Sequence, residues 1–338
     1  MTPPEVTVLT AVRNGADYLG ETIACIQAQT FTNWEYIIVD DASTDNTAAI
    51  VDGAIKTDGR LRILRRETAG GPYAAANEGI QEARGKYIVR IDADDLSPKD
   101  RIQRQFDFLQ QNRRFRACVT FWQAYDGTKL IPGSVTEVPV DQDVFCWYLL
   151  LRSPSLHSSV CYQREAILEI GGYRELPLSQ DYRLWCELTR RRWLGVMPEV
   201  LSYVRTHQNR ESLQKGELQR NLALDILAEH LRALSGETWS RVELNALWTV
   251  GHGHPMPIKR GLEMLDRWDR LWKSAHLKSE QEGELERLSA FRRWKHLRGN
   301  ARKQPAQALW SAMQYGLSMR KARLRPQVRY ARPQAGER

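Results

Sequence analysis

The chain has 338 residues, 42% of them hydrophobic, and a formal net charge of +8. These values favour an ordinary globular protein with one large domain or two. No apolar run reaches the roughly 18 residues that a membrane-spanning helix needs, and the first residues lack the pattern of a secretory signal.

The five cysteines are scattered, and none of them forms a C-x-x-C pair. We therefore expect small buried thiols in a reducing, cytoplasmic compartment rather than a disulfide or zinc framework. The positive charge is concentrated at the C-terminus. From Arg287 onward there are 14 basic residues and one acidic residue, which leaves 35 basic and 40 acidic residues in the rest of the chain.

Strand and helix patterns alternate over the first ninety residues. Buried-type strands are predicted at 6–12, 36–39, 61–64 and 87–91. Three helices are expected between them: one that starts near residue 16, one that ends near residue 56, and one over 73–83. This alternation predicts an α/β fold with a Rossmann-like, mostly parallel central sheet flanked by helices. Neither a G-x-G-x-x-G nor a Walker-type phosphate loop is present.

The second part of the chain is less regular. A helix over 98–111 and a strand over 116–122 are followed by a polar segment, then by a short strand, a helix and the turn Gly171-Gly172-Tyr173. A helix opens at 179–182, and a last strand covers 201–205. We expect an α/β domain over 1–212 with halves at 1–115 and 116–212, a helical C-terminal region over 213–320, and a basic, disordered tail over 321–338.

Three carboxylates follow the fourth strand, in the stretch RGKYIVRIDADD. Asp92, Asp94 and Asp95, here called the acidic strand end, would repel one another unless a positive group lies among them. Mg²⁺ or Mn²⁺ prefers such oxygen ligands and leaves positions open for phosphates. Ligands bind outside the carboxyl ends of parallel strands, so the pattern indicates a metal-bridged diphosphate site. The alternative is an acidic surface turn before a helix.

Several motifs together resemble the inverting family 2 glycosyltransferases, whose fold is called GT-A. The stretch VTVLTAVRNGADYLGETIACIQAQTFTNWEYIIVDDASTDNT is similar to the N-terminal signature of that family, and RGKYIVRIDADD to its Asp-x-Asp strand. SSVCYQREAILEIGGYRE and SQDYRLWCEL resemble its acceptor half and its general-base helix. The resemblance runs from Thr7 to His207 and leaves out the helical remainder.

The resemblance implies roles for individual residues. Asp41 would accept a hydrogen bond from the nucleotide base, Asp92 would lie near the ribose and diphosphate, Asp94 would bind the metal, and Asp181 would deprotonate the acceptor hydroxyl. His207 would be a second metal ligand or, alternatively, a capping histidine on a turn. The remaining residues expected at the substrate or nucleotide are Ala11, Arg13, Asn14, Gly71, Asn77, Trp185 and Arg205. For Trp185, a position in the core is the competing interpretation.

Three positions depart from the family pattern. Arg13 replaces a tyrosine that would stack on the base, Ala76 replaces an arginine, and Gln180 replaces a glutamate before the base. An arginine plane can also stack on a base, so the nucleotide stays open. Gln180 spares Asp181 an adjacent negative charge.

These features predict a metal-dependent glycosyltransferase. It would move a sugar from a nucleotide-diphosphate donor, a UDP-sugar first, to a hydroxyl of a glycan or lipid-linked acceptor with inversion, in cell-surface polysaccharide synthesis. The cofactor would be Mn²⁺ or Mg²⁺. A catalytically degenerate nucleotide-sugar-binding protein and a glycosidase, which also uses two carboxylates, are the alternatives. No nucleic-acid partner is expected.

The C-terminal basic region, residues 287–338, interleaves its charges with Trp, Leu and Met. This composition is typical of an interfacial helix on an anionic membrane, which would place the enzyme on the inner face of the cytoplasmic membrane. The alternative is that Trp294 and Trp310 pack on the folded protein and that the charges form a solvated face.

Overall fold

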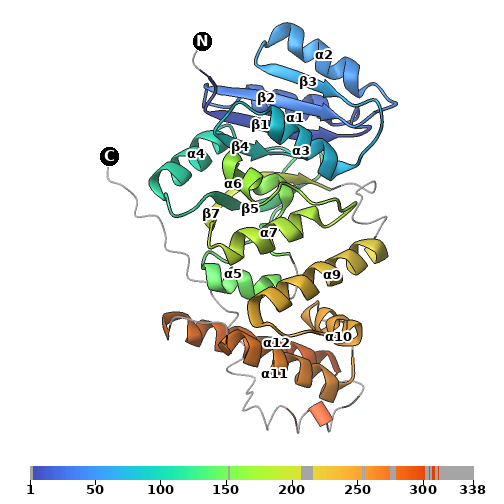
Figure 1. Cartoon of the computed structure of the whole chain (residues 1–338), viewed down its shortest axis with the longest axis vertical. Coiled ribbons are helices and arrows are strands. Elements are labelled where there is room, and N and C mark those ends of the chain that lie inside the picture. Colours follow the sequence, from blue (N-terminus) through green and yellow to red (C-terminus); the bar gives the residue numbers. More distant parts are fainter. Residues whose placement is uncertain are drawn as a thin grey trace. The chain divides into compact units, whose positions relative to one another are not determined.

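The computed structural model describes residues 3–150, 153–206, 216–252, 254, 256–274, 279–300, 304, 307–308 and 311 (Figure 1). The chain forms two compact units. The first comprises Met1–Val138 and Ser155–Leu222, and the second comprises Pro139–Pro154 and Ala223–Arg338. Residues 139–154 thus group with the C-terminal helices, although they lie within the predicted α/β domain.

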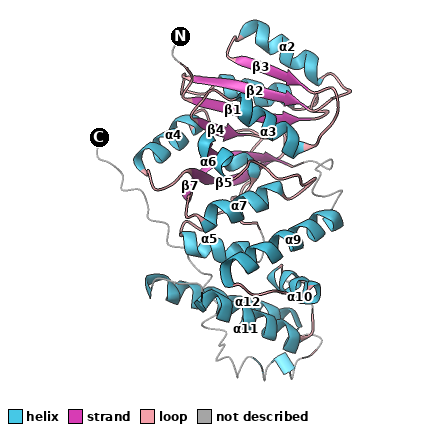
Figure 2. Ribbon diagram, in the orientation of Figure 1, coloured by secondary structure: helices cyan, strands magenta, loops and turns pink. Residues whose placement is uncertain are grey.

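The first unit is built on a seven-stranded sheet with the order β3-β2-β1-β4-β6-β5-β7 (Figure 2). Its strands are β1 (Val6–Val12), β2 (Trp34–Asp40), β3 (Leu61–Arg65), β4 (Tyr87–Arg90), β5 (Ala117–Tyr125), β6 (Cys161–Gln163) and β7 (Leu194–Arg205). All pairs are parallel except those that β6 makes with β4 and β5. The predicted α/β fold with a mostly parallel sheet is confirmed.

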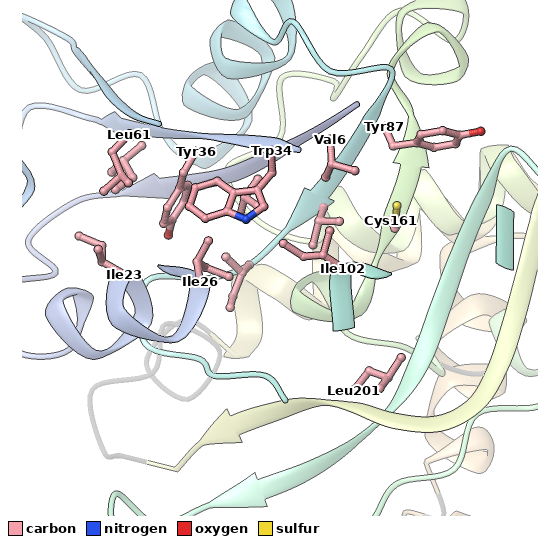
Figure 3. Packing of buried hydrophobic residues seen from close by; sticks show 14 of the residues in the cluster. Val6, Ile23, Ile26, Trp34, Tyr36, Leu61, Tyr87, Ile102, Cys161 and Leu201 are labelled. Atoms are coloured by element: carbon pink, nitrogen blue, oxygen red, sulfur yellow. The ribbon is translucent and has the colours of Figure 1, made fainter. Parts of the chain in front are cut away.

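Helices connect the strands of this sheet. They are α1 (Leu19–Gln27), α2 (Thr47–Thr57), α3 (Pro72–Glu82), α4 (Arg101–Gln111), the 3₁₀ turn η1 (His157–Ser159), α6 (Arg164–Glu169) and α7 (Gln180–Arg190). Ile23 and Ile26 of α1 share a buried face with the strand residues Val6 and Tyr36 (Figure 3). Strands buried on both faces read as continuous apolar runs, which is why the first strands were visible in the sequence.

Two elements differ from prediction. The last strand begins at Leu194, seven residues earlier than expected, and its register against β5 shifts between Thr120 and Trp122. Pro198 falls in this irregular stretch, where a missing N–H is tolerated. The fourth helix begins at Arg101 rather than 98, since Leu96 instead forms a bridge with Tyr203.

The second unit is helical. It contains α5 (Gln142–Leu149), which was not predicted, with α10 (Arg241–Gly251), α11 (Ile258–Ser274), α12 (Ser279–Asn300) and most of α9 (Gly216–Ser235). Asp141 caps α5 by accepting from the backbone of Asp143 and Val144. Trp147 of α5 packs on Trp268 of α11 with ring centroids 4.1 Å apart, in the centre of this unit's core.

Candidate active site

The sheet register gathers the ends of three neighbouring strands. β1 lies between β2 and β4, and all three run in the same direction. The Asp41 N–H donates to the Val12 carbonyl at 2.8 Å, and the Ile91 N–H donates to the Leu9 carbonyl at 3.2 Å. Asp41 and the acidic strand end therefore lie at the same edge of the sheet, where open α/β sheets bind ligands.

A buried arginine lies beneath the acidic strand end. The Arg90 side chain is only 3% exposed, and its guanidinium is 2.9 Å from Asp92 Oδ1, whose own side chain is 40% exposed. The Asp92 N–H donates to Ser158 Oγ at 2.8 Å. One of the three carboxylates thus has a fixed cationic partner within the protein. The sequence carried one signal of this, an arginine inside an otherwise apolar strand.

Asp95 points into the protein rather than out of it. It is buried, and its Oδ1 accepts the Arg205 N–H at 3.2 Å. Burial, together with the charges of Asp94 and Asp92, raises the pKa of Asp95 to about 8. Asp94 and Asp92 are therefore the two carboxylates of the cluster that could face a ligand.

Arg205 hydrogen-bonds to the backbone of the acidic strand end. Its Nε donates to the Asp94 carbonyl at 3.1 Å, and its guanidinium is 2.7 Å from Glu21 Oε2. The rings of Tyr18 and Tyr125 lie 4.8 and 5.0 Å from its central carbon. Because the side chain is 5% exposed and occupied by these partners, it holds the backbone at Asp94 in place.

Asp41 closes the turn before α3. Its two carboxylate oxygens accept the N–H groups of Gly70 and Gly71, each at 2.8 Å, and Arg66 Nε lies 2.8 Å from Oδ1. Gly71 has a φ of +85°, a conformation that favours glycine. The carboxylate that the resemblance assigns to the nucleotide base is thus buried and already holds the turn that would flank the base.

The loops after β1 and β2 are tied together. The Asn14 N–H donates to Ser43 Oγ at 2.9 Å, and Asn14 Oδ1 accepts the Thr44 N–H at 2.8 Å. Asp45 Oδ2 accepts the Ala16 N–H at 3.0 Å. Asn14 therefore shapes this rim of the site. The adjacent Arg13 is exposed, and Ala11 lies at the end of β1 opposite Val39.

Asp181 occupies the first turn of α7, after Ser179 in a left-handed conformation. Its Oδ1 accepts the N–H of Tyr182 at 2.8 Å. Burial raises the pKa of Asp181 to about 6, and the charge of Asp92 acts in the same direction. The acidic strand end and the predicted base, 89 residues apart in sequence, are therefore close enough to interact. A carboxylate with a pKa near 6 is a competent base at neutral pH.

A polar network links the two halves of this unit. The side-chain amide of Asn77 on α3 makes two hydrogen bonds to the Tyr173 backbone. Its Nδ2–H donates to the Tyr173 carbonyl at 2.7 Å, and its Oδ1 accepts the Tyr173 N–H at 2.8 Å. His157 Nε2 is 2.6 Å from the Tyr173 hydroxyl. Burial, with the nearby charge of Arg90, lowers the pKa of His157 to about 3. His157 is therefore a neutral, hydrogen-bonded residue, and Asn77 holds the 172–173 turn.

Trp185 lies one helical turn beyond Asp181 and is fully buried. This favours its role as a core residue that supports the start of α7. His207 lies outside the residues that the structure describes.

The donor set fits a hard divalent cation that shares its ligands with a diphosphate. Within the described residues, no group of three His, Cys, Asp or Glu side chains could enclose a metal ion. Asp94, with Asp92 beside it, offers carboxylate oxygens at a strand end, and Asp92 is already engaged by Arg90. Mg²⁺ and similar ions are commonly held by one or two carboxylates together with substrate phosphates.

Fold and site together describe an α/β protein with an acidic sheet edge and one separate carboxylate of raised pKa. Comparison with known proteins agrees. The model of the family described as glycosyl transferase family 2 matches residues 7–164. The teichuronic acid biosynthesis protein TuaG of Bacillus subtilis is 34% identical over 218 residues, which cover 63% of this chain and 83% of TuaG. The chain belongs to glycosyltransferase family 2.

Further relatives extend the comparison. EpsE of Bacillus subtilis, named as a glycosyltransferase, is 29% identical over 60% of this chain and 73% of its own. The structure of S. aureus TarS with UDP-GlcNAc covers 93% of both chains with a TM-score of 0.56 and 16% identity. The Pyrobaculum calidifontis mannosyltransferase PcManGT with GDP-Man and Mn²⁺ covers 96% of this chain and 88% of its own, with a TM-score of 0.53 and 18% identity. The last two matches establish the GT-A fold.

The protein is thus a glycosyltransferase that uses a nucleotide-sugar donor. The glycosidase alternative is excluded by family membership. No helix among the described residues is long and apolar enough to cross a membrane.

Proposed function

We propose that this protein transfers a sugar from a nucleotide-diphosphate donor to a glycan hydroxyl with inversion, and that the reaction depends on a divalent metal. The observation that carries the proposal is the pairing of Asp181, with its pKa raised to about 6, and Asp92 at the acidic strand end. A base on one element and a diphosphate site on another are what a single displacement needs.

The base role follows from position and charge. Asp181 is ionised above pH 6 and can accept the proton of the acceptor hydroxyl as that oxygen attacks the anomeric carbon. The hydrogen bond from Tyr182 N–H to Oδ1 leaves the second carboxylate oxygen for this proton. Attack from the side opposite the departing diphosphate inverts the anomeric centre. Holding the acceptor and the donor in line supplies much of the remaining rate.

The leaving diphosphate would be held through a divalent cation whose protein ligand is Asp94, with Asp92 beside it. When bound there, Mn²⁺ or Mg²⁺ would act as a Lewis acid that neutralises the charge developing on the diphosphate. Arg205 keeps the Asp94 backbone in place through its Nε hydrogen bond, and Arg90 prevents the Asp92 charge from adding fully to the repulsion. His207 would be a further ligand.

For the nucleotide, we take a uridine as the first candidate, since the Asp41 carboxylate can accept the uracil N3–H. Asp41 is held by the turn at Gly70 and Gly71, so the base would pack on that turn with Arg13 and Asn14 at its rim. Ala11 and Asn77 would line the floor. TarS, which shares the fold, was solved with UDP-GlcNAc, which supports a UDP-sugar as the first donor to test.

For the acceptor, we propose a glycan of the cell surface. TuaG, which is named for teichuronic acid biosynthesis, supports this class. The deciding experiment is a screen of sugar nucleotides for release of the nucleoside diphosphate, with and without Mn²⁺ and with candidate acceptors. Release that needs both metal and acceptor supports the proposal. Donor turnover that is undiminished by a chelator would remove the metal from the mechanism.

A further inference from the structure

A pocket of about 400 Å³ lies in the first unit, apart from the residues assigned to the reaction. Its wall combines the end of α1, the segment after the acidic strand end, the loop after β5, and β7. The lining residues are Cys25, Ala28, Leu96, Ser97, Lys99, Tyr125, Thr128, Lys129, Leu130 and Tyr203. Its volume lies within the range of small-molecule sites. The carboxylates Asp41, Asp92, Asp94 and Asp181 are not part of its lining.

The pocket carries positive charge. Lys99 and Lys129 both line it, and among the residues that the structure describes neither ammonium group belongs to an ion pair. The carboxylates that lie close to these lysines in the sequence have other partners. Asp100 pairs with Arg104 Nε at 2.7 Å, and Asp126 accepts from the Thr128 and Lys129 N–H groups at 2.9 Å each. The two lysines are therefore available to an anionic ligand.

The remaining wall suits a sugar. Tyr125 and Tyr203 contribute aromatic rings, whereas the hydroxyls of Ser97 and Thr128 already bond within the protein, Ser97 accepting from the Gln29 amide at 3.4 Å and Thr128 donating to Asp126 at 2.7 Å. The Tyr125 hydroxyl donates to the Gly127 carbonyl at 2.8 Å, which fixes the ring in place. The Leu96 and Tyr203 backbones hydrogen-bond to each other at 2.8 and 2.9 Å, so this part of the pocket is preformed. Aromatic faces pack against sugar C–H groups, while lysines bind a carboxylate or phosphate.

We propose that this pocket binds an anionic sugar unit, one that carries a carboxylate or a phosphate, of the glycan on which the enzyme acts. The inference extends the proposed function by naming the chemical class of the acceptor. Tyr125 connects the pocket to the reaction edge, since its ring also packs against Arg205, which binds the Asp94 carbonyl. A polymer held here would keep its other units at a high effective concentration near that edge.

The test is calorimetric titration of the full chain, without donor or metal. The probes are trigalacturonic acid, which carries carboxylates, a glycerol phosphate trimer, and the methyl ester of trigalacturonic acid as the neutral match. We expect binding of at least one anionic probe, weakened by salt, and affinity for the ester lower by about tenfold or more, because the charge-assisted bonds are lost. Binding of one anionic probe alone identifies which anion the pocket takes.

Two double variants locate the site. Lys99→Gln with Lys129→Gln should weaken binding by about tenfold or more, since each charge-assisted bond contributes strongly. Lys56→Gln with Lys86→Gln removes the same charge from exposed positions outside the pocket and should leave binding unchanged. Cys25 gives a second readout. It lines the pocket while the other four thiols are buried, so a bound probe should slow its reaction with a thiol reagent.

Equal affinity for acid and ester, or full affinity in the Lys99 and Lys129 variant, would overturn the proposal. The outcome is separable from that of the proposed function. Asp181→Asn should bind the probe as the unsubstituted protein does, because Asp181 does not line the pocket. Transfer that survives in Asp181→Asn, with probe binding retained, therefore counts against the proposed base alone, and intact transfer without probe binding in the unsubstituted protein counts against the pocket alone.

Discussion

In the α/β unit, Asp92, Asp94 and Asp95 follow one another at a strand end, and Arg90 pairs with Asp92. In the helical unit, acids lie beside arginines. Arg293 on α12 contacts Asp266, at 2.7 Å, and Asp269 on α11. Crowded carboxylates cost free energy in the absence of a ligand, whereas paired charges do not need one. The crowded carboxylates therefore make the first unit the place where we expect binding and chemistry.

The sharpest test of this contrast is Asp181→Asn. The amide keeps the shape of the side chain but cannot accept the acceptor proton, so the transfer rate should fall by about 10²–10⁴-fold. Donor affinity should stay within a few-fold, because the base does not hold the nucleotide. Asp225→Asn makes the same change in an exposed ion pair of the helical unit and should leave the rate unaltered. Most of the turnover surviving in Asp181→Asn would refute the assignment.

Asp94→Ala should remove metal-dependent donor binding. Without this carboxylate the diphosphate loses its bridging cation, and we expect the affinity for UDP in Mn²⁺ to fall by about tenfold or more, towards the value measured without metal. Calorimetry of UDP with and without Mn²⁺ measures both quantities. Asp225→Ala is the control in the helical unit. A metal-dependent gain in affinity that persists in Asp94→Ala would place the metal elsewhere.

The pH dependence should follow Asp181. Burial raises the pKa of Asp181 to about 6, so its basic form is lost as the pH falls below that value, and kcat/KM should drop about tenfold per pH unit there. The residual activity of Asp181→Asn should lack this step. His157 should not contribute, since burial lowers its pKa to about 3. A profile that is flat from pH 7 to 5 would contradict the assignment.

The raised pKa of Asp181 also makes the folding stability of the protein depend on pH. A carboxyl group whose pKa is raised on folding makes the native state less stable as the pH rises from the unfolded value to the folded one. Above pH 6 the native protein therefore carries the cost of an ionised, partly buried Asp181. Asp181→Asn should raise the melting temperature at pH 7 but have little effect near pH 3. An equal shift at both pH values would point to packing instead.

Asn77→Ala should act on the connection between the halves of the α/β unit. The change removes two hydrogen bonds to the Tyr173 backbone and should destabilise the unit by about 2 kcal/mol. Urea unfolding measures this. Asn112→Ala, which removes a single hydrogen bond to the Phe108 carbonyl within its own helix end, is the matched control and should cost about half as much. Equal effects would mean that Asn77 has no special connecting role.

The sequence was sufficient for the fold of the first unit because its strands are buried on both faces and end in polar turns. Asp92 and Asp94 stood out because acids crowded at a strand end repel one another, whereas Asp181 was proposed only from the resemblance to family 2 glycosyltransferases. The pairing of Arg90 with Asp92 and the attachment of Asn77 to Tyr173 were not predicted. The second of these depends on which segments become neighbours, since Asn77 and Tyr173 are 96 residues apart, whereas Arg90 and Asp92 belong to the same strand end. The early start of β7 was missed for a different reason, since Pro198 normally argues against a strand.

The last and smallest expected effect concerns the C-terminal basic region, residues 287–338. Arg292 and Arg293 within it belong to the helical unit, where Arg292 donates to the Gly251 carbonyl at 2.6 Å and Arg293 pairs with α11. Deletion from residue 287 would therefore remove part of a folded unit. A truncation after Ser311, itself buried, spares these contacts and still removes seven basic residues and one acidic residue.

Each basic residue near an anionic leaflet contributes about 1 kcal/mol, so those seven are enough for reversible docking. We expect the full chain to co-sediment with vesicles that contain phosphatidylglycerol, less so at high salt, and the chain ending at Ser311 to stay in the supernatant. Vesicles of phosphatidylcholine alone are the control for apolar insertion. Equal partition of the two proteins would show that the tail charges serve no membrane contact, and that the enzyme reaches its acceptor without docking on the lipid surface.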